Sequence, residues 1–316
     1  MKPTRAEIGC ALQRKWIAVR YATSKASALA YPSAPPPTVP TPANGVSGPS
    51  INCIVFSKNR PMQLEACLRS IERFAPYDNP VTVIHKATGE AFEEGYRQLA
   101  SDIGQVRFVQ QSDDFRRDVL RAVDGRFEYT VFHTDDDVFF RKPLMRPRMG
   151  DRFAAFSLRL GENTTYCYPE SSDQPIPRRD QRESFIAWNW IRASQDFAYP
   201  MSLDGHIFPT TVLRRVLAYA RFDNPNDLET ELHVRRHLAP SGMLAYQHSC
   251  VVSIPANIVT PTYRNRVSQD PKWSPDSLNR RFLSGERIDL DAMNFSDVRG
   301  AHQEIPFVFT QEARRR

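Results

Sequence analysis

Three consecutive carboxylates, Asp135, Asp136 and Asp137, come shortly after an apolar and aromatic run at 129–133. Like charges repel one another and lose hydration beside apolar neighbours, so some other group must compensate them. In an extended chain alternate side chains share a face, which would bring Asp135 and Asp137 together and turn Asp136 away. Two hard oxygen ligands on one side suit Mg²⁺ or Mn²⁺. The pattern predicts a divalent metal site, and a solvated acidic turn is the alternative.

Ahead of these carboxylates, apolar runs of strand length alternate with stretches whose apolar residues recur at helical spacing. This alternation is typical of an α/β fold with a mostly parallel sheet flanked by helices. The aspartates then stand at the carboxyl end of the fourth strand, which is where open α/β sheets bind ligands. The predicted strands cover 51–56, 81–84, 106–109 and 129–133, and the predicted helices cover 64–74, 92–103 and 115–123.

The first predicted strand leads into a polar loop that ends just before Pro61, a residue favoured in the first turn of a helix. The loop consists of Ser57, Lys58, Asn59 and Arg60. This loop, the order of the elements and the Asp-x-Asp spacing of Asp135 and Asp137 together resemble nucleotide-sugar glycosyltransferases of the A fold type. The resemblance is clearest over 52–143.

The resemblance implies a single Rossmann-like domain in which 50–143 binds the nucleotide sugar and 144–310 binds the acceptor. It assigns donor contacts to Ser57, Lys58, Asn59, Arg60, Asp135 and Asp136. It assigns the divalent cation, Mn²⁺ or Mg²⁺, to Asp135 and Asp137. Near the C-terminus, His302 resembles a histidine that some members of the family recruit as an additional metal ligand.

The second half offers carboxylates that could take the proton from an acceptor hydroxyl. Asp204 precedes a glycine in a loop that leads into a predicted helix, and it ranks first. Glu229 ranks second; Glu231 lies two residues further on, so on a helix the two side chains diverge. The Glu-Asp dipeptide that is usual in inverting members of the family is absent from this region, which leaves the stereochemistry open.

Trp188 and Trp190 are a further feature of the second half. Their rings could stack on a sugar or simply pack in the core, and the sequence does not separate these two roles.

Three functions fit these residues. The first is metal-dependent transfer of a sugar from a nucleoside diphosphate to a hydroxyl of a sugar, a lipid-linked molecule or a protein. Nucleotidyl transfer on a related fold is the second, although it calls for a glycine-rich phosphate loop and 57–60 contains no glycine. The third is a sugar-binding protein without catalysis, against which the intact Asp135 and Asp137 argue.

The charge of the chain is unevenly distributed. Residues 1–49 hold six Lys and Arg against a single Glu, and they are rich in proline. We therefore expect a disordered tail and linker, with contact between this basic tail and a membrane surface as a further expectation. Three arginines end the chain, so the part between the tails has a slightly negative net charge although the whole chain carries +6. This distribution argues against nucleic acid as a partner.

Composition narrows the class of protein further. Hydrophobic residues make up 41% and charged residues 25%, which is ordinary for a globular protein. No run of the sequence is apolar enough to cross a membrane. The five cysteines lack any C-x-x-C spacing, which favours reduced thiols and a cytoplasmic location.

Overall fold

A computed structural model of the chain describes residues 50–75, 77, 81–143, 149–182, 184–259, 266–268 and 270–311. The tail predicted at 1–49, with its expected disorder and membrane contact, lies outside the described residues. Among the described helices, none combines the length and apolar character needed to cross a bilayer.

The first half of the described chain has the alternating elements that the sequence predicts. Pro61 occupies the first turn of the helix that follows the first strand. Each predicted strand and helix up to residue 134 is present, with ends that differ by only a few residues. The elements are β1 (Ile51–Lys58), α2 (Pro61–Phe74), β2 (Val81–Lys86), α3 (Glu90–Asp102), β3 (Val106–Gln110), α4 (Phe115–Ala122) and β4 (Tyr129–Thr134).

The second half is built from shorter pieces. The segment 251–259 is largely apolar in sequence, yet it is a strand only over its first three residues. The elements are β5 (Asp137–Phe139), β6 (Phe153–Ser157), β7 (Tyr166–Cys167), β8 (Ser172–Asp173), β9 (Arg179–Arg182), β10 (Phe185–Asn189), β11 (His206–Pro209), α5 (Thr210–Leu217), α6 (Pro225–Val234), β12 (Gly242–Tyr246), β13 (Val251–Ser253), α7 (Pro275–Leu283), β14 (Glu286–Ile288) and β15 (Phe309–Gln311).

One sheet joins the two halves. Its order is β3-β2-β1-β4-β11-β6-β12-β10-β9, and β4 pairs directly with β11. The pairs among β3, β2, β1 and β4 are parallel, whereas β11 and β10 run against their neighbours. The predicted α/β fold with a mostly parallel central sheet flanked by helices is therefore confirmed.

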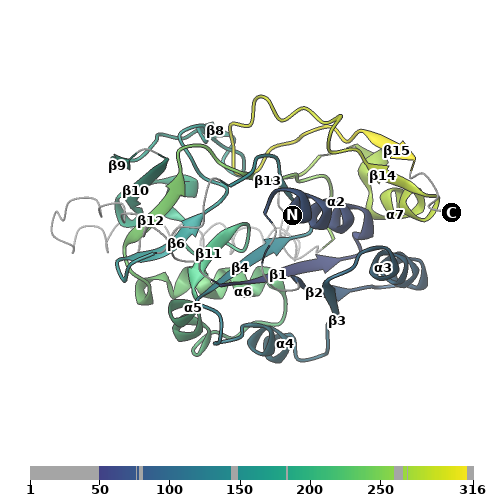
Figure 1. The fold of residues 1–316 in the computed structure, drawn as a ribbon, viewed down its shortest axis with the longest axis horizontal. Coiled ribbons are helices and arrows are strands. Elements are labelled where there is room, and N and C mark those ends of the chain that lie inside the picture. The colour runs from purple at the N-terminus through teal and green to yellow at the C-terminus, as the bar shows by residue number, and fades with distance from the viewer. Residues whose placement is uncertain are drawn as a thin grey trace, which may run out of the picture.

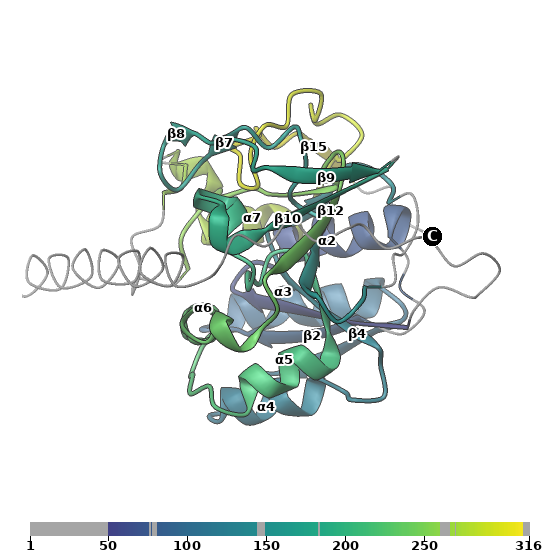
Figure 2. The ribbon, with the colours of Figure 1, turned by 90° about the vertical axis from the view of Figure 1, so that its left-hand side faces the viewer.

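Helices cover both faces of this sheet. Figures 1 and 2 show α2, α3 and α7 on one face and α4 and α5 on the other. The side chains of β1 alternate between the two cores: Cys53 and Val55 join one cluster, and Ile54 and Phe56 join the other. Burial on both faces explains why the parallel strands read as continuous apolar runs.

Trp188 and Trp190 belong to this core. Trp188 is fully buried and its indole nitrogen donates to the carbonyl of Phe197 at 2.9 Å. The Trp190 indole nitrogen donates to the carbonyl of Pro240 at 2.7 Å. Of the two roles left open by the sequence, the structure therefore supports packing, and neither indole forms an exposed platform for a sugar ring.

Candidate active site

The three consecutive aspartates do not lie in extended chain. β4 ends at Thr134, Asp135 and Asp136 form a turn, and β5 begins at Asp137. The alternation that would have placed Asp135 and Asp137 on one face is therefore interrupted, and that expectation was wrong. Each carboxylate instead has its own set of partners.

Asp135 is bound by the loop that follows β1. One carboxylate oxygen accepts from the guanidinium of Arg60 at 2.8 Å, and the other accepts from the Ser57 hydroxyl at 2.8 Å and the Lys58 amide at 3.2 Å. Burial raises the pKa of Asp135 to about 6, although the charge of Arg60 opposes this shift. Three of the four predicted loop residues therefore contact Asp135.

The same loop is fixed from its other side. Asn59 has a φ of 54°, and its side-chain amide donates to the hydroxyl of Thr88, two residues after β2, at 2.6 Å. The Arg60 side chain also donates to the Asn257 side chain at 2.8 Å. Arg60 therefore joins the Asp135 turn to the second half of the chain.

Asp137 points into the protein core. It is fully buried, and its two oxygens meet His133 Nδ1 at 2.8 Å and the Ser253 hydroxyl at 2.6 Å. Burial raises the pKa of Asp137, while the hydrogen bond from His133 opposes the rise. Both oxygens are thus occupied by side chains of the protein, away from solvent.

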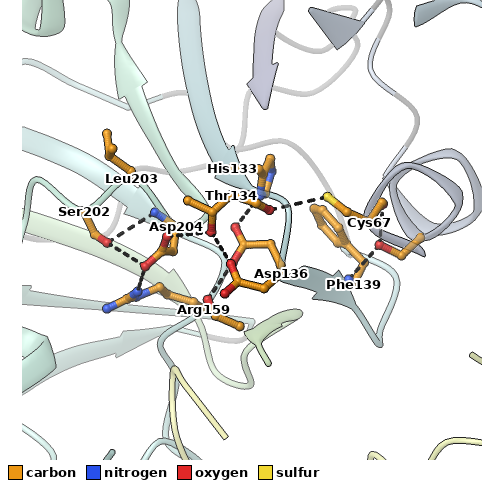
Figure 3. A network of polar contacts seen from close by, with 12 residues as sticks. Cys67, His133, Thr134, Asp136, Phe139, Arg159, Ser202, Leu203 and Asp204 are labelled. Atoms are coloured by element: carbon orange, nitrogen blue, oxygen red, sulfur yellow. Dashed lines mark hydrogen bonds and ion pairs between the residues drawn. The ribbon is translucent and has the colours of Figure 1, made fainter. Parts of the chain in front are cut away.

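Asp136 is the most exposed of the three, with 18% of its side chain accessible. It accepts from the Thr134 hydroxyl at 2.7 Å, and the Arg60 guanidinium lies 3.4 Å away. The same Thr134 oxygen lies 3.0 Å from Asp204, so it stands between the two carboxylates (Figure 3). The one proton of the Thr134 hydroxyl is shared between two acceptors. Asp136 of the first half and Asp204 of the second half therefore lie on either side of the same hydroxyl group.

Asp204 enters this cluster from the loop before β11, where Gly205 takes the left-handed φ of +67° that glycine tolerates. Its second oxygen meets the Arg159 guanidinium at 2.8 Å and His302 Nε2 at 3.3 Å. Burial alone would raise the pKa of Asp204, but the His302 hydrogen bond and the Arg159 charge hold it well below its usual range. Asp204 is therefore a buried carboxylate that stays ionised.

Glu229 joins the same cluster from α6. It accepts from the Ser202 hydroxyl at 3.0 Å and from the Leu203 amide at 3.2 Å. Burial raises the pKa of Glu229, and the negative charge of Asp204 raises it further. Glu231 faces elsewhere and accepts from the Arg221 amide at 2.7 Å, so the two glutamates diverge as their spacing indicates.

Two residues at this site were missed by the sequence reasoning. Arg159 is buried and pairs with Asp204, and it also lies 3.6 Å from Asp196 in a short 3₁₀ helix at Gln195–Ala198. Thr134 links Asp136 to Asp204. Thr134 ends β4 and Arg159 lies two residues after β6, so a position after an apolar run is the only signal that the sequence offered for either residue.

The predicted metal ligands are not assembled into one group. Across the described residues, no three His, Cys, Asp or Glu side chains are arranged to hold a metal ion. Asp137 has both oxygens hydrogen-bonded in the core, and His302 pairs with Asp204 instead of approaching Asp135. The set of Asp135, Asp137 and His302 therefore does not fit a metal ion in this geometry, and Asp136 is the carboxylate with accessible surface.

No protein-family model matches this chain. A curated relative, the bifunctional glycosyltransferase pgtA of Dictyostelium discoideum, is 25% identical over 182 residues. The match covers 50% of this chain and 24% of that relative, so the chain spans about a quarter of the relative's length.

Several solved structures resemble the chain at low identity. A mannosyltransferase from Pyrobaculum calidifontis, in complex with GDP-Man and Mn²⁺, is 13% identical with a TM-score of 0.38, covering 77% of this chain and 66% of that one. S. aureus TarS 1–349 in complex with UDP-GlcNAc is 10% identical with a TM-score of 0.40, covering 69% and 62%. A cytidylyltransferase from Leptospira borgpetersenii is 15% identical with a TM-score of 0.35, covering 59% and 71%.

Proposed function

We propose that the protein transfers a sugar from a nucleoside diphosphate donor to a hydroxyl acceptor. The observation that carries the proposal is the line of polar side chains at the end of β4: Asp136, Thr134, Asp204, Ser202 and Glu229. It combines an accessible carboxylate, a carboxylate held ionised and a carboxyl group with a raised pKa. The glycosyltransferase of Dictyostelium discoideum, matched over half of this chain, supports the same reaction class.

In this proposal, the loop 57–60 and Asp136 contact the donor. Arg60 carries a permanent positive charge near the turn and could meet a donor phosphate, since guanidinium binds phosphate oxygens well. Mn²⁺ or Mg²⁺, when bound with the donor, would neutralise charge on the departing diphosphate. Asp136 is the residue through which the protein would meet that cation, because its carboxylate is accessible.

For the base, the contacts favour Glu229 over Asp204, which reverses the order suggested by the sequence. A general base works best when its pKa lies near the working pH. The pKa of Glu229 is raised towards that range, whereas that of Asp204 is lowered by its two cationic neighbours. Asp204 then orients Ser202 and Thr134, and Glu229 accepts the proton of the acceptor hydroxyl.

The first experiment is a thermal-shift screen of nucleotide sugars with Mn²⁺ present. A donor at a hundred times its Kd adds about 2.7 kcal/mol to the free energy of unfolding, which is a rise of roughly 5–10 °C in Tm. Release of the nucleoside diphosphate on turnover supports glycosyl transfer. Release of pyrophosphate from a nucleoside triphosphate supplied together with a sugar phosphate would instead indicate nucleotidyl transfer, and binding without turnover would indicate a sugar-binding protein.

Once an acceptor is known, Glu229→Gln and Asp204→Asn are compared for turnover at saturating donor. Loss of a general base lowers kcat by about 10²–10⁴-fold, so Glu229→Gln should fall in that range. Glu231→Gln is the matched control on the same helix, and it should retain turnover. Near-normal turnover in both site variants would point to a retaining mechanism and overturn the assignment of a base.

A further inference from the structure

Ser202 has a fully buried hydroxyl group that stands between two carboxylates of the site. Its oxygen lies 3.0 Å from Glu229 Oε1 and 3.4 Å from Asp204 Oδ2, and it accepts from the Asp204 amide at 3.2 Å (Figure 3). A hydroxyl group has a single proton, so Ser202 can donate to only one of the two carboxylates at a time. The direction of that proton decides what the residue does.

Asp204 needs this proton less than Glu229 does. Asp204 Oδ2 already meets the Arg159 guanidinium at 2.8 Å and His302 Nε2 at 3.3 Å. Glu229 has no ion-pair partner among the described residues, and its contact with Ser202 is the shorter of the two. A hydrogen bond is strongest where it compensates a charge that nothing else compensates, so the Ser202 proton is directed at Glu229.

The Leu203 amide adds a second donor to the same atom. It donates to Glu229 Oε1 at 3.2 Å, so two consecutive residues of the loop before β11 hold one oxygen of the carboxylate. In the part of the chain that the structure describes, no group donates to Oε2, and the Glu229 side chain is only half-buried. The carboxylate is therefore fixed through Oε1 and left open at Oε2.

The charged groups that act on Glu229 come from three segments. Asp204, in the loop before β11, raises the pKa of Glu229, and Arg159, after β6, opposes the rise. His233 lies one turn further along α6. The hydrogen bonds at Oε1 also oppose the rise in pKa, because a donor stabilises the ionised form of a carboxylate. Ser202 and Asp204 thus act on the base in opposite directions.

We propose that Ser202 is a positioning residue of this site: together with the Leu203 amide it holds Glu229 Oε1 and directs Oε2 at the acceptor hydroxyl. The proposal rests on the function proposed above, in which Glu229 is the base, and it names the atom that takes the proton. As the acceptor oxygen bonds to the sugar carbon, the bond from that carbon to the diphosphate oxygen breaks, and the acceptor proton passes to Oε2. Ser202 keeps its own proton throughout.

The first test needs no substrate. ¹³C NMR of the full chain, labelled at the glutamate carboxyl carbons, follows the titration of Glu229, whose signal is the one missing in Glu229→Gln. Ser202→Ala should move the midpoint of that titration upward by about one pH unit, because the ionised carboxylate loses a donor. Ser70→Ala is the matched control. Ser70 is also fully buried with two hydrogen bonds, so its loss should lower Tm similarly and leave the Glu229 titration unchanged.

The second test measures catalysis with water as the acceptor. Hydrolysis of GDP-mannose or UDP-GlcNAc in the presence of Mn²⁺ is followed by release of the nucleoside diphosphate as a function of pH. Ser202→Ala should lower kcat by about tenfold through misplacement of the base, and should leave the KM for the donor unchanged. The acidic limb of its pH profile should move upward with the NMR midpoint, since the base works only when ionised. Ser202→Thr restores a hydroxyl and should recover the wild-type limb.

The outcomes separate this proposal from the wider one. An unchanged Glu229 titration in Ser202→Ala, or an equal shift in Ser70→Ala, would overturn the positioning role and leave the proposed function standing. If Ser202→Ala is too unstable to titrate, Ser202→Cys keeps the size with a weaker donor and should give a smaller upward shift; no shift there would overturn the role as well. Wild-type hydrolysis in Glu229→Gln would overturn the base itself and, with it, the role of Ser202.

Discussion

Asp137 and Asp204 are both buried carboxylates that meet a histidine, yet their surroundings treat the negative charge in opposite ways. Around Asp137 the partners are His133 and the Ser253 hydroxyl, and burial raises its pKa. Asp204 contacts both His302 and the Arg159 guanidinium, and these two groups lower the pKa of Asp204. The difference between the two sites is therefore a permanent cation: Asp204 has the Arg159 guanidinium beside it and stays ionised, whereas Asp137 has only neutral or titratable partners.

Removal of Arg159 should have the largest effect. Arg159→Met keeps much of the side-chain volume but leaves Asp204 and Asp196 without their buried cation. Breaking a buried ion pair in this way costs about 3–5 kcal/mol of unfolding free energy, which urea denaturation measures. Arg179→Met removes a more exposed ion pair with Glu162 and should cost at most about 1 kcal/mol. Equal losses in the two variants would contradict the comparison.

Asp137→Ala should come next. It leaves His133 Nδ1 and the Ser253 hydroxyl unpaired in the core, which costs about 2–3 kcal/mol in all. The sequence analysis instead assigns Asp137 to a divalent cation, and loss of such a ligand would relieve repulsion among the carboxylates and leave the fold intact. A variant with unchanged stability that has lost metal-dependent donor binding would restore that earlier interpretation. Calorimetric donor titrations beside urea denaturation distinguish the two.

His206 gives a pH-dependent test of the Asp204 region. Burial and the nearby Arg159 charge lower the pKa of His206 to about 3, although Asp204 and the Pro200 carbonyl oppose this. The unfolded chain binds a proton near the ordinary value of about 6.5, so stability falls as the pH drops below it. Between pH 7 and pH 5 this one residue should cost about 2 kcal/mol.

The measurement compares urea denaturation of the wild type and His206→Gln at both pH values. The variant should lose correspondingly less stability on acidification. His237→Gln is the control, since His237 is exposed and should leave the pH dependence unchanged. An identical pH dependence in all three proteins would show that His206 is not held neutral.

Asp136→Asn should have the smallest effect on the fold and a clear effect on the ligand. Asn can still accept the hydrogen bond from Thr134 while it loses the charge beside Arg60, so the unfolding free energy should change by no more than about 1 kcal/mol. Donor binding in the presence of Mn²⁺ should weaken, because the accessible carboxylate is lost. Unchanged donor binding would remove Asp136 from the proposed donor site. The contrast between Asp137 and Asp204 would then stand without it.

The first half of the fold could be predicted because each buried parallel strand is a continuous apolar run and each helix shows its own periodicity. The second half was harder, since its strands are as short as two or three residues and such runs carry little periodicity. The placement of β11 between β4 and β6 depends on pairing between distant segments, which a local pattern does not record.

At the site, the sequence drew attention to Asp136, Asp204 and Glu229, and the structure places them in one hydrogen-bonded line through Thr134 and Ser202. The orientation of the aspartates could not be predicted, because it depends on a turn at Asp135 and Asp136 that interrupts the extended chain. Arg159 was also beyond the sequence: a lone arginine after a strand is common, and only its burial beside Asp204 reveals what it does. The roles of these residues stay predictions.

The position of β11 also bears on how the chain is made. During synthesis β1 to β4 emerge first and can pair, yet one edge of β4 stays open until 206–209 leave the ribosome and cover it. The residues of β4 are almost wholly buried in the finished protein. An unpaired strand edge can pair with other chains. The nascent chain is therefore most prone to aggregation while the first half is made and β11 is not. A truncated chain that ends before β11 should therefore be poorly soluble, whatever the stability of the complete fold.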